Sequence, residues 1–420
     1  MSDLSPQNAK FVKRVRIDLA PGGTNSVGFE SAFERWGRFF SRARHISFIQ
    51  INIDEHDSMS DQSTKTFNLI KEINSIKSLQ NVEMVLQEPA LASSPILSGS
   101  EELRFISSIL SILSMKIITL TTHRPISCSL LNSWVSVLPN LQELHLHDSC
   151  PSYTDDRLSQ KNLSMLLSVQ NLTCFEQSHR ILPNIKSKTI NHLILGPEVL
   201  SFETWKAVRE TLPNLHNLEI EQRLLPPYRT LQKWTIDPVK FDKLRMLKLH
   251  GRVVYFPKEL IPSIVTINRD IRDISIIGNW RDTDILSIST NCGKLQSFEF
   301  QRDSLGRGAG HYLTHETISA LSKCSQLAHL KFDESVLPFS VVAMKSLSMN
   351  CRWLNSITLE MDFLSTIFGC SSHLEERFLD EQIILFWRDC AGVQLPKDEE
   401  SWKRPLCVLD LSKVRERLRI

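Results

Sequence analysis

The stretch Cys292–Phe300, CGKLQSFEF, recurs as Cys324–Phe332, CSQLAHLKF, and as Cys351–Leu359, CRWLNSITL. In each copy a cysteine stands three residues before a leucine, which opens a pattern of apolar residues at its first, fourth and sixth positions. The chain has only nine cysteines in 420 residues. Three such coincidences by chance therefore have a probability on the order of one in 100,000. The pattern predicts repeated structural units that stack on one another.

The same apolar pattern opens at thirteen places along the chain, and a segment with helical apolar spacing precedes most of them. In segment 202–212, for example, the apolar residues fall on one side of a helix that leads into the pattern at Leu215. One helix and one strand cannot bury their apolar sides alone, so neighbouring units must stack into a parallel sheet with helices on one side. The pattern begins at Val12, Ala43, Leu79, Met115, Leu141, Ile190, Leu215, Leu244, Ile271, Leu295, Leu327, Leu354 and Leu406.

These Cys-x-x-Leu-x-x-Leu-x-Leu units resemble the leucine-rich-repeat family, in particular the cysteine-containing subclass of F-box/leucine-rich-repeat proteins, the substrate receptors of cullin-RING ubiquitin ligases. The resemblance implies a curved, right-handed α/β solenoid, with parallel strands on the concave face and helices on the convex face. It also implies a non-catalytic scaffold that selects substrates for ubiquitination. F-box proteins carry a helical module that opens with a Leu-Pro pair, and no such module precedes Val12. We therefore expect either a fragment or a divergent, fungal-type relative that lost this module, or a protein that resembles the family only in its repeats and never joined a ligase.

The repeats predict one array over residues 1–361, with irregular insertions at about 150–190 and 301–314. A weakened copy of the pattern is expected at Leu172, inside the first insertion. After residue 361 the regularity stops, and the apolar segment Leu374–Trp387 favours a helix. We interpret residues 362–420 as a helical cap on the last repeat, with a possible last strand at 406–411.

Composition narrows the class of protein. The formal net charge is +2, so no overall basic field indicates nucleic acid or membrane as a partner. The first ten residues contain no apolar core of signal-peptide length. Nine cysteines, an odd number, are scattered along the chain and fit reduced thiols in a core better than a disulfide framework. We expect a soluble protein of the cytoplasm or nucleus.

Alternate strand residues should point outward from the concave face, and their side chains are the candidate partner-binding residues. Over all strands the outward positions hold ten carboxylates (residues 18, 83, 143, 219, 221, 273, 299, 333, 360 and 410) and four bases (14, 16, 248 and 331), a balance of −6. This balance predicts a protein partner with a basic patch, bound by a monomer or within a hetero-complex; alternatively, the positions are polar only because they are solvated. The partner-binding candidates are Glu143, His145, His147, His192, Glu219, Glu221, Lys248, His250, Glu299, His329, Lys331 and Asp333.

No catalytic or metal-binding set emerges from the sequence. His145 and His147 alternate onto one face beside Glu143, but one strand supplies too few ligands for a metal, and surface histidines are the simpler interpretation. Those histidines could instead make partner binding sensitive to pH. The glycines of Gly306–Gly310 lack the Lys-Ser or Lys-Thr of a phosphate loop. We expect no enzyme, metal or cofactor. An alternative function is that of a leucine-rich-repeat regulator or inhibitor of another enzyme, a GTPase or a nuclease.

Overall fold

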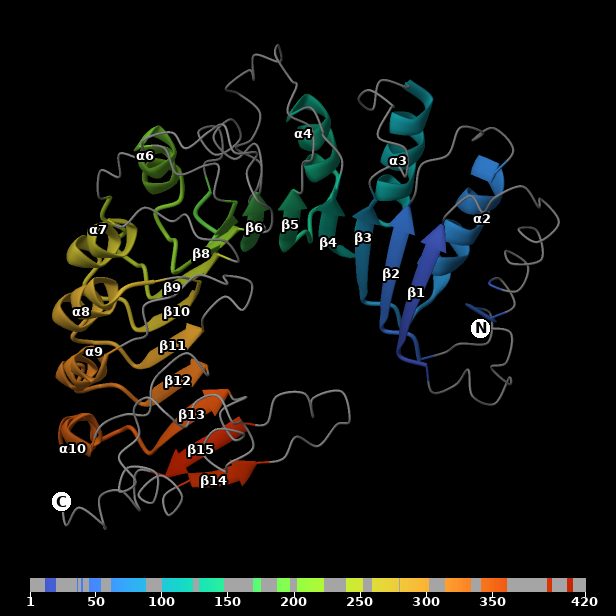
Figure 1. The fold of residues 1–420 in the computed structure, drawn as a ribbon. Helices are drawn as coiled ribbons and strands as arrows, with labels where there is room; N and C mark the ends of the chain where they lie inside the picture. The colour runs from blue at the N-terminus through green and yellow to red at the C-terminus, as the bar shows by residue number, and fades with distance from the viewer. Residues whose placement is uncertain are drawn as a thin grey trace, which may run out of the picture. The chain divides into compact units, whose positions relative to one another are not determined.

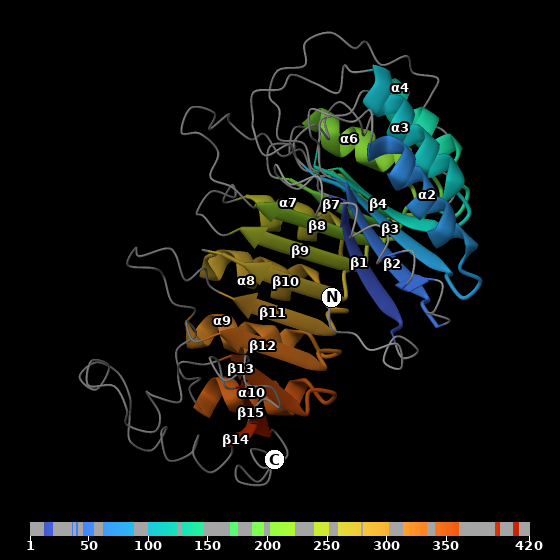
Figure 2. The ribbon, with the colours of Figure 1, turned by 90° about the vertical axis from the view of Figure 1, so that its right-hand side faces the viewer.

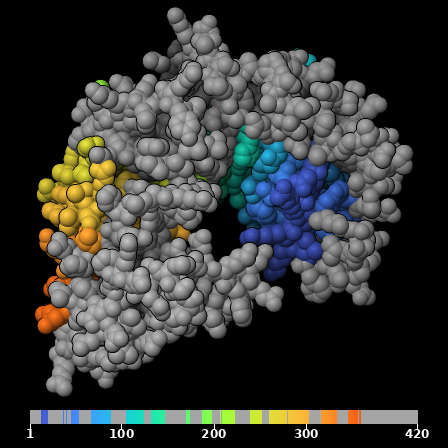
Figure 3. All heavy atoms as spheres, in the orientation of Figure 1, coloured from blue at the N-terminus to red at the C-terminus, as the bar shows by residue number. Residues whose placement is uncertain are grey.

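The computed structural model describes residues 12–19, 36, 39–40, 45–53, 62–87, 100–123, 128–146, 169–174, 187–196, 202–222, 239–251, 259–278, 280–301, 314–333, 341–360, 391–394 and 406–410. The coloured atoms of Figure 3 belong to these residues. They fall into two compact units. Unit 1 comprises Met1–Ile194 with Glu210–Asn214, and unit 2 comprises Leu195–Arg209 with Leu215–Ile420.

Unit 1 contains a parallel sheet in which each strand pairs with the next in sequence, from β1 to β6. Its strands and helices are β1 (Arg14–Leu19), β2 (Phe48–Ile53), α2 (Gln62–Ser75), β3 (Asn81–Leu86), α3 (Ser100–Ile112), β4 (Ile117–Thr122), α4 (Cys128–Ser136), β5 (Glu143–Leu146), β6 (Asn171–Cys174) and β7 (His192–Leu195), the last of which ends at the boundary with unit 2.

Unit 2 contains a second run of parallel strands, from β8 to β13, again paired in sequence order. Helix α6 (Phe202–Thr211) crosses the boundary between the units. The elements of unit 2 are β8 (Asn217–Gln222), β9 (Met246–Gly251), α7 (Leu260–Ile267), β10 (Asp273–Ile277), α8 (Asp282–Asn291), β11 (Ser297–Gln301), α9 (His315–Ala320), the 3-10 turn η5 (Leu321–Lys323), β12 (His329–Asp333), α10 (Val341–Asn350), β13 (Ser356–Glu360), β14 (Ala391–Gln394) and β15 (Leu406–Asp410).

Within each unit the helices lie on one side of the strands. In unit 2, helices α7 to α10 line one face of strands β9 to β13, and in unit 1 helices α2 to α4 stand beside β2 to β5 (Figures 1 and 2). The strands are not closed into a barrel. The predicted α/β class, with parallel strands in sequence order and helices on one face, is confirmed.

The three cysteines of the opening pattern are core residues, as their spacing predicts. Cys292, Cys324 and Cys351 have no exposed surface, and the thiol of Cys351 lies 3.4 Å from the backbone oxygen of Cys324. Burial raises the pKa of the Cys292 thiol to about 12, and the pKa of Cys324 likewise to about 12. The Cys292 and Cys324 thiols therefore stay protonated, and all three cysteines pack as small groups in the core.

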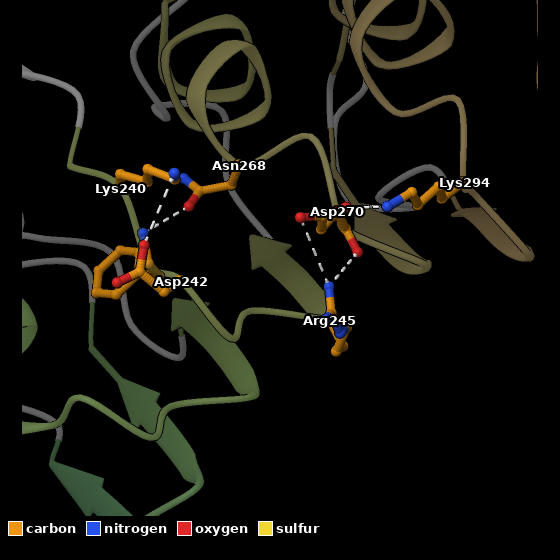
Figure 4. Close-up of polar contacts among 7 residues, drawn as sticks. Lys240, Asp242, Arg245, Asn268, Asp270 and Lys294 are labelled. Carbon is orange, nitrogen blue, oxygen red and sulfur yellow. Dashed lines mark hydrogen bonds and ion pairs between the residues drawn. The ribbon is translucent and has the colours of Figure 1, made fainter.

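The turn before β10 is held by a buried asparagine (Figure 4). The Asn268 side-chain amide donates to the backbone oxygens of Val239, at 3.1 Å, and Ile264, at 2.9 Å. Its Oδ1 accepts a hydrogen bond from the Phe241 backbone N–H at 2.7 Å. One side chain therefore links the end of α7 to the turn of the preceding repeat and satisfies buried backbone groups in both.

The second strand differs from its prediction by three residues. The pattern at Ala43 predicts outward positions at His45 and Ser47, whereas β2 is Phe48–Ile53 and Ile46 is its buried opening residue. Both windows satisfy the apolar pattern, but only the one at Ile46 places Ile49 and Ile51 in the core. The outward residues of β2 therefore include Gln50 instead of His45 and Ser47.

Two further predictions concern the strands after residue 146. The weakened copy at Leu172 is confirmed, because β6 contains this fully buried leucine. The last strand is confirmed at Leu406–Asp410, but it pairs with β13 in the antiparallel direction instead of continuing the parallel series. The predicted helix at Leu374–Trp387 and most of the insertion 301–314 lie outside the described residues. In the part of the chain that the structure describes, no helix has the length and apolar character to span a membrane.

Candidate functional site: the polar faces of the strands

Unit 2 carries a band of polar side chains across the face of its strands that the apolar core leaves open. Along β9, buried Leu247 and Leu249 alternate with the half-buried Lys248 and His250. The strand register aligns Glu219, Lys248, Ser275, Glu299 and Lys331 in one row across β8 to β12. Together with Glu221 and His250, these residues are called the polar strip. Five strands spaced about 4.8 Å apart give it a length of about 19 Å.

Hydrogen bonds and ion pairs connect the polar strip. At one end Glu219 lies 3.7 Å from the Lys248 ammonium and 3.5 Å from the His250 imidazole. In the centre the other ring nitrogen of His250 lies 3.3 Å from the Ser275 hydroxyl, which donates to Glu299 at 3.0 Å. At the far end Lys331 donates to Glu299 at 2.8 Å. These contacts form a network in which each of the six side chains Glu219, Lys248, His250, Ser275, Glu299 and Lys331 meets one from a neighbouring strand.

The carboxylate of Glu299 is kept ionised by its neighbours. Burial acts to raise its pKa, but the hydrogen bond and the charge of Lys331, with the hydrogen bond from Ser275, outweigh burial, so the pKa lies below its ordinary value. The Lys331 ammonium therefore faces an anion at neutral pH. The side chain of Glu219 is only 12% exposed, and its carboxylate lies between the Lys248 ammonium and the His250 imidazole.

The pKa of His250 gives the first testable prediction. Burial lowers this pKa below 6.5 more than the Glu219 charge raises it, so the imidazole is neutral at pH 7. Between its pKa in the folded state and about 6.5, the unfolded chain binds more protons; the stability that the neutral ring contributes is therefore present above about pH 6.5 and is lost as the pH falls. NMR titration of the imidazole should show a midpoint below 6.5. The Glu219→Gln variant should lower it further, and a wild-type midpoint above 6.5 would contradict the prediction.

Unit 1 has a separate polar cluster on β4, β5 and β6. Glu143 accepts hydrogen bonds from the Thr119 hydroxyl at 3.2 Å and from the Asn171 amide at 3.0 Å. One ring nitrogen of His145 lies 2.8 Å from the Thr173 hydroxyl, and the other lies 3.7 Å from Glu143. These contacts occupy the candidate ligand atoms with protein partners. Among the described residues, no three side chains of His, Cys, Asp or Glu are arranged to hold a metal ion.

The structure places eleven of the twelve predicted residues on strands, three in unit 1 and eight in unit 2, and the ten of them whose side chains are described are half-buried or exposed. His147 lies outside the described residues, as does the side chain of Asp333. His192 is half-buried on β7, and His329 is exposed at the start of β12. The predicted partner-binding residues do not include Ser275, although its hydroxyl joins the two halves of the polar strip. Its signal was the same alternation, since Ser275 occupies an outward position on β10.

The described side chains cover part of the outward positions for which the sequence predicts an acidic balance. Asp333, Glu360 and Asp410 lie outside the described side chains, which leaves seven carboxylates against four bases, a balance of −3. Three of those bases contact carboxylates directly: Arg16 with Asp18, Lys248 with Glu219, and Lys331 with Glu299. Unit 2 also holds Glu221 and Asp273 at outward strand positions.

No protein-family model matches this chain, and a search of curated proteins gives no match.

Proposed function

We propose that the chain is a protein-recognition scaffold that binds its partner through the polar strip and has no reaction of its own. The observation that carries the proposal is the connected row from Glu219 to Lys331, which five separate strands hold in a fixed order. A partner meets oriented charges on a rigid sheet, so little side-chain entropy is lost on binding. Rigid elements that present polar groups at a fixed spacing favour specific recognition.

The finer proposal is that the scaffold is a leucine-rich-repeat array and selects substrates in an F-box-type ubiquitin ligase. It is supported by the full burial of Cys292, Cys324 and Cys351, which are the cysteines of the Cys-x-x-Leu-x-x-Leu-x-Leu units and lie where a helix leads into a strand. It is also supported by the parallel strands in sequence order. The second candidate is a regulator of a GTPase or nuclease. It is favoured by the acidic side chains of Glu221 and Asp273 at outward strand positions, which would complement a basic substrate-binding surface.

Charge reversal tests the role of the polar strip. We expect Glu221→Lys to weaken partner capture at least tenfold, because a new cation would face the basic patch of the partner. The matched control is Glu259→Lys, which makes the same charge change at an exposed residue beside α7. Captured proteins would be identified by mass spectrometry after purification from the native cell, at low and high salt. Equal capture by both variants, with equal salt dependence, would overturn the proposal.

The identity of a protein that Glu221→Lys loses separates the two finer proposals. Cullin-RING ligase subunits that co-purify with the chain would support substrate selection, whereas a GTPase or nuclease retained by wild type and by Glu259→Lys would support the regulator. A partner lost equally from both variants would show that overall charge, and not the strip, governs binding.

A further inference from the structure

The helix-to-strand turns of unit 2 form a second charged surface, which the strand positions do not include. Because β9 to β13 are parallel, the turns that lead into them, residues 239–245, 268–272, 292–296, 323–328 and 351–355, all lie at the same edge of the sheet. This surface is called the basic edge. It holds eight lysines and arginines and two carboxylates, a balance of +6 on a chain whose total is +2.

Each of the five turns holds at least one cation, and the cation of the fourth turn, Lys323, is the last residue of η5. Lys240, Lys243 and Arg245 precede β9, and Arg269 and Arg272 precede β10. One cation precedes each of the next three strands: Lys294, Lys323 and Arg352. All of these side chains are exposed except Arg245, which is half-buried. Strands about 4.8 Å apart therefore carry a periodic row of positive charge.

The two carboxylates of the basic edge orient part of the row without neutralising it (Figure 4). Asp270 lies 2.6 Å from the Lys294 ammonium and 4.0 Å from the Arg245 guanidinium, so it connects the turns of three successive repeats. The hydrogen bond from Lys294 keeps the pKa of Asp270 below its ordinary value. Asp242 lies 3.8 Å from Lys240. Two anions cannot offset eight cations, so the edge keeps a strong positive field.

An exposed aromatic ring stands at the β13 end of the row. Trp353 follows Arg352 in the turn before β13, and 70% of its surface is exposed. A tryptophan is normally among the more buried residues, and an exposed one beside a row of cations offers a flat surface for stacking. A nucleobase stacks on such a ring, whereas an acidic peptide gains little from it.

We propose that the basic edge of unit 2 binds single-stranded nucleic acid, with the lysines and arginines on the phosphates and Trp353 stacked against a base. Arginine matches phosphate geometry with two parallel hydrogen bonds, and the row supplies four arginines. The sequence predicts no nucleic-acid partner because the net charge of the whole chain is small. In that net charge the positive charge of the basic edge is offset by the negative charge of the outward strand positions. The proposal is independent of the polar strip, which lies on the face of the sheet and not at its edge.

The test measures binding of a fluorescein-labelled 20-nucleotide oligo(dT) by fluorescence anisotropy at several salt concentrations. A triple variant, Arg272→Ala, Lys323→Ala and Arg352→Ala, should weaken binding at least tenfold and reduce the slope of log Kd against log salt by about 2, since each phosphate contact contributes about 0.7. The matched control removes three exposed charges from helices of unit 2, Lys206→Ala, Arg209→Ala and Lys345→Ala, and should bind as wild type. Thermal melting would confirm that both variants fold.

A second pair of variants separates nucleic acid from an acidic protein segment. Trp353→Ala should weaken oligo(dT) binding at least fivefold, and Trp353→Phe, which keeps an aromatic ring, should restore most of it. The proposal is overturned if wild type does not bind oligo(dT) at 50 mM salt, or if the triple variant binds no more weakly than its control. It is also overturned if poly-L-glutamate binds as tightly as oligo(dT) and Trp353→Ala changes neither, which would assign the edge to an acidic protein.

Discussion

The Gly278→Ala variant is expected to lower the free energy of unfolding of unit 2 by about 3 kcal/mol or more. Gly278 follows β10 with a φ of 141°, a conformation that L side chains rarely adopt. A methyl group at this position would lie 2.8 Å from the Gly251 backbone oxygen, closer than carbon and oxygen pack. The residue is also fixed in place, since its N–H donates to the Gln301 oxygen at 2.9 Å. The backbone strain and the steric overlap of the new methyl group should therefore both lower the free energy of unfolding.

Gly293→Ala is the matched control for this variant. A methyl group on Gly293 would have no neighbouring atom within 4 Å, and the residue does not have a positive φ in the range that disfavours side chains. We expect its unfolding midpoint in urea to equal or slightly exceed that of wild type. If both variants unfold at the same urea concentration, the close approach of Gly278 to Gly251 does not constrain the fold.

The Asn268→Ala variant is expected to cost about 2–3 kcal/mol of stability, because it leaves the buried Phe241 N–H and the Val239 oxygen without the amide they bond in the folded protein. The loss should destabilise the turns before β9 and β10 together. Faster hydrogen exchange of the Phe241 amide, measured by NMR or mass spectrometry, would report this directly.

An exposed asparagine supplies the comparison. Asn140 donates a single hydrogen bond, 2.8 Å long, to the Met115 backbone oxygen in a turn of unit 1. Asn140→Ala removes one solvent-accessible contact and should cost about 0.5 kcal/mol. Equal losses of unfolding free energy in the two variants would show that water replaces the Asn268 amide and that its burial does not increase the cost of removing it.

The sequence predicted the strands of unit 2 well because their opening residues are buried. The cysteine register places the outward positions two residues after Leu295, Leu327 and Leu354, where β11, β12 and β13 begin. The prediction failed at β2, where an outward aromatic residue completes a false apolar window. Phe48 contacts the Arg14 guanidinium, which lies 5.5 Å from its ring centre. The Phe48 ring therefore packs against a cation instead of lying in the core.

The candidate site was predictable as a set of positions but not as a network. Alternation along β9 assigns Lys248 and His250 to the outward face. Their contacts with Glu219 and Ser275 depend on the register between strands that are more than twenty residues apart, which no local pattern encodes. The basic edge escaped prediction for a different reason: its cations belong to turns, which follow no strand periodicity.

The reversal at β15 has a consequence for how the protein behaves at high concentration. Parallel stacking could in principle continue from β13 into the first strand of a second copy, and repeated addition would give a filament. Strand β15 instead occupies the free hydrogen-bonding side of β13 in the opposite direction, and the four-residue β14 follows it. A copy arriving in parallel register at β13 finds that side already paired. The antiparallel pairing of β15 thus blocks parallel strand addition to β13.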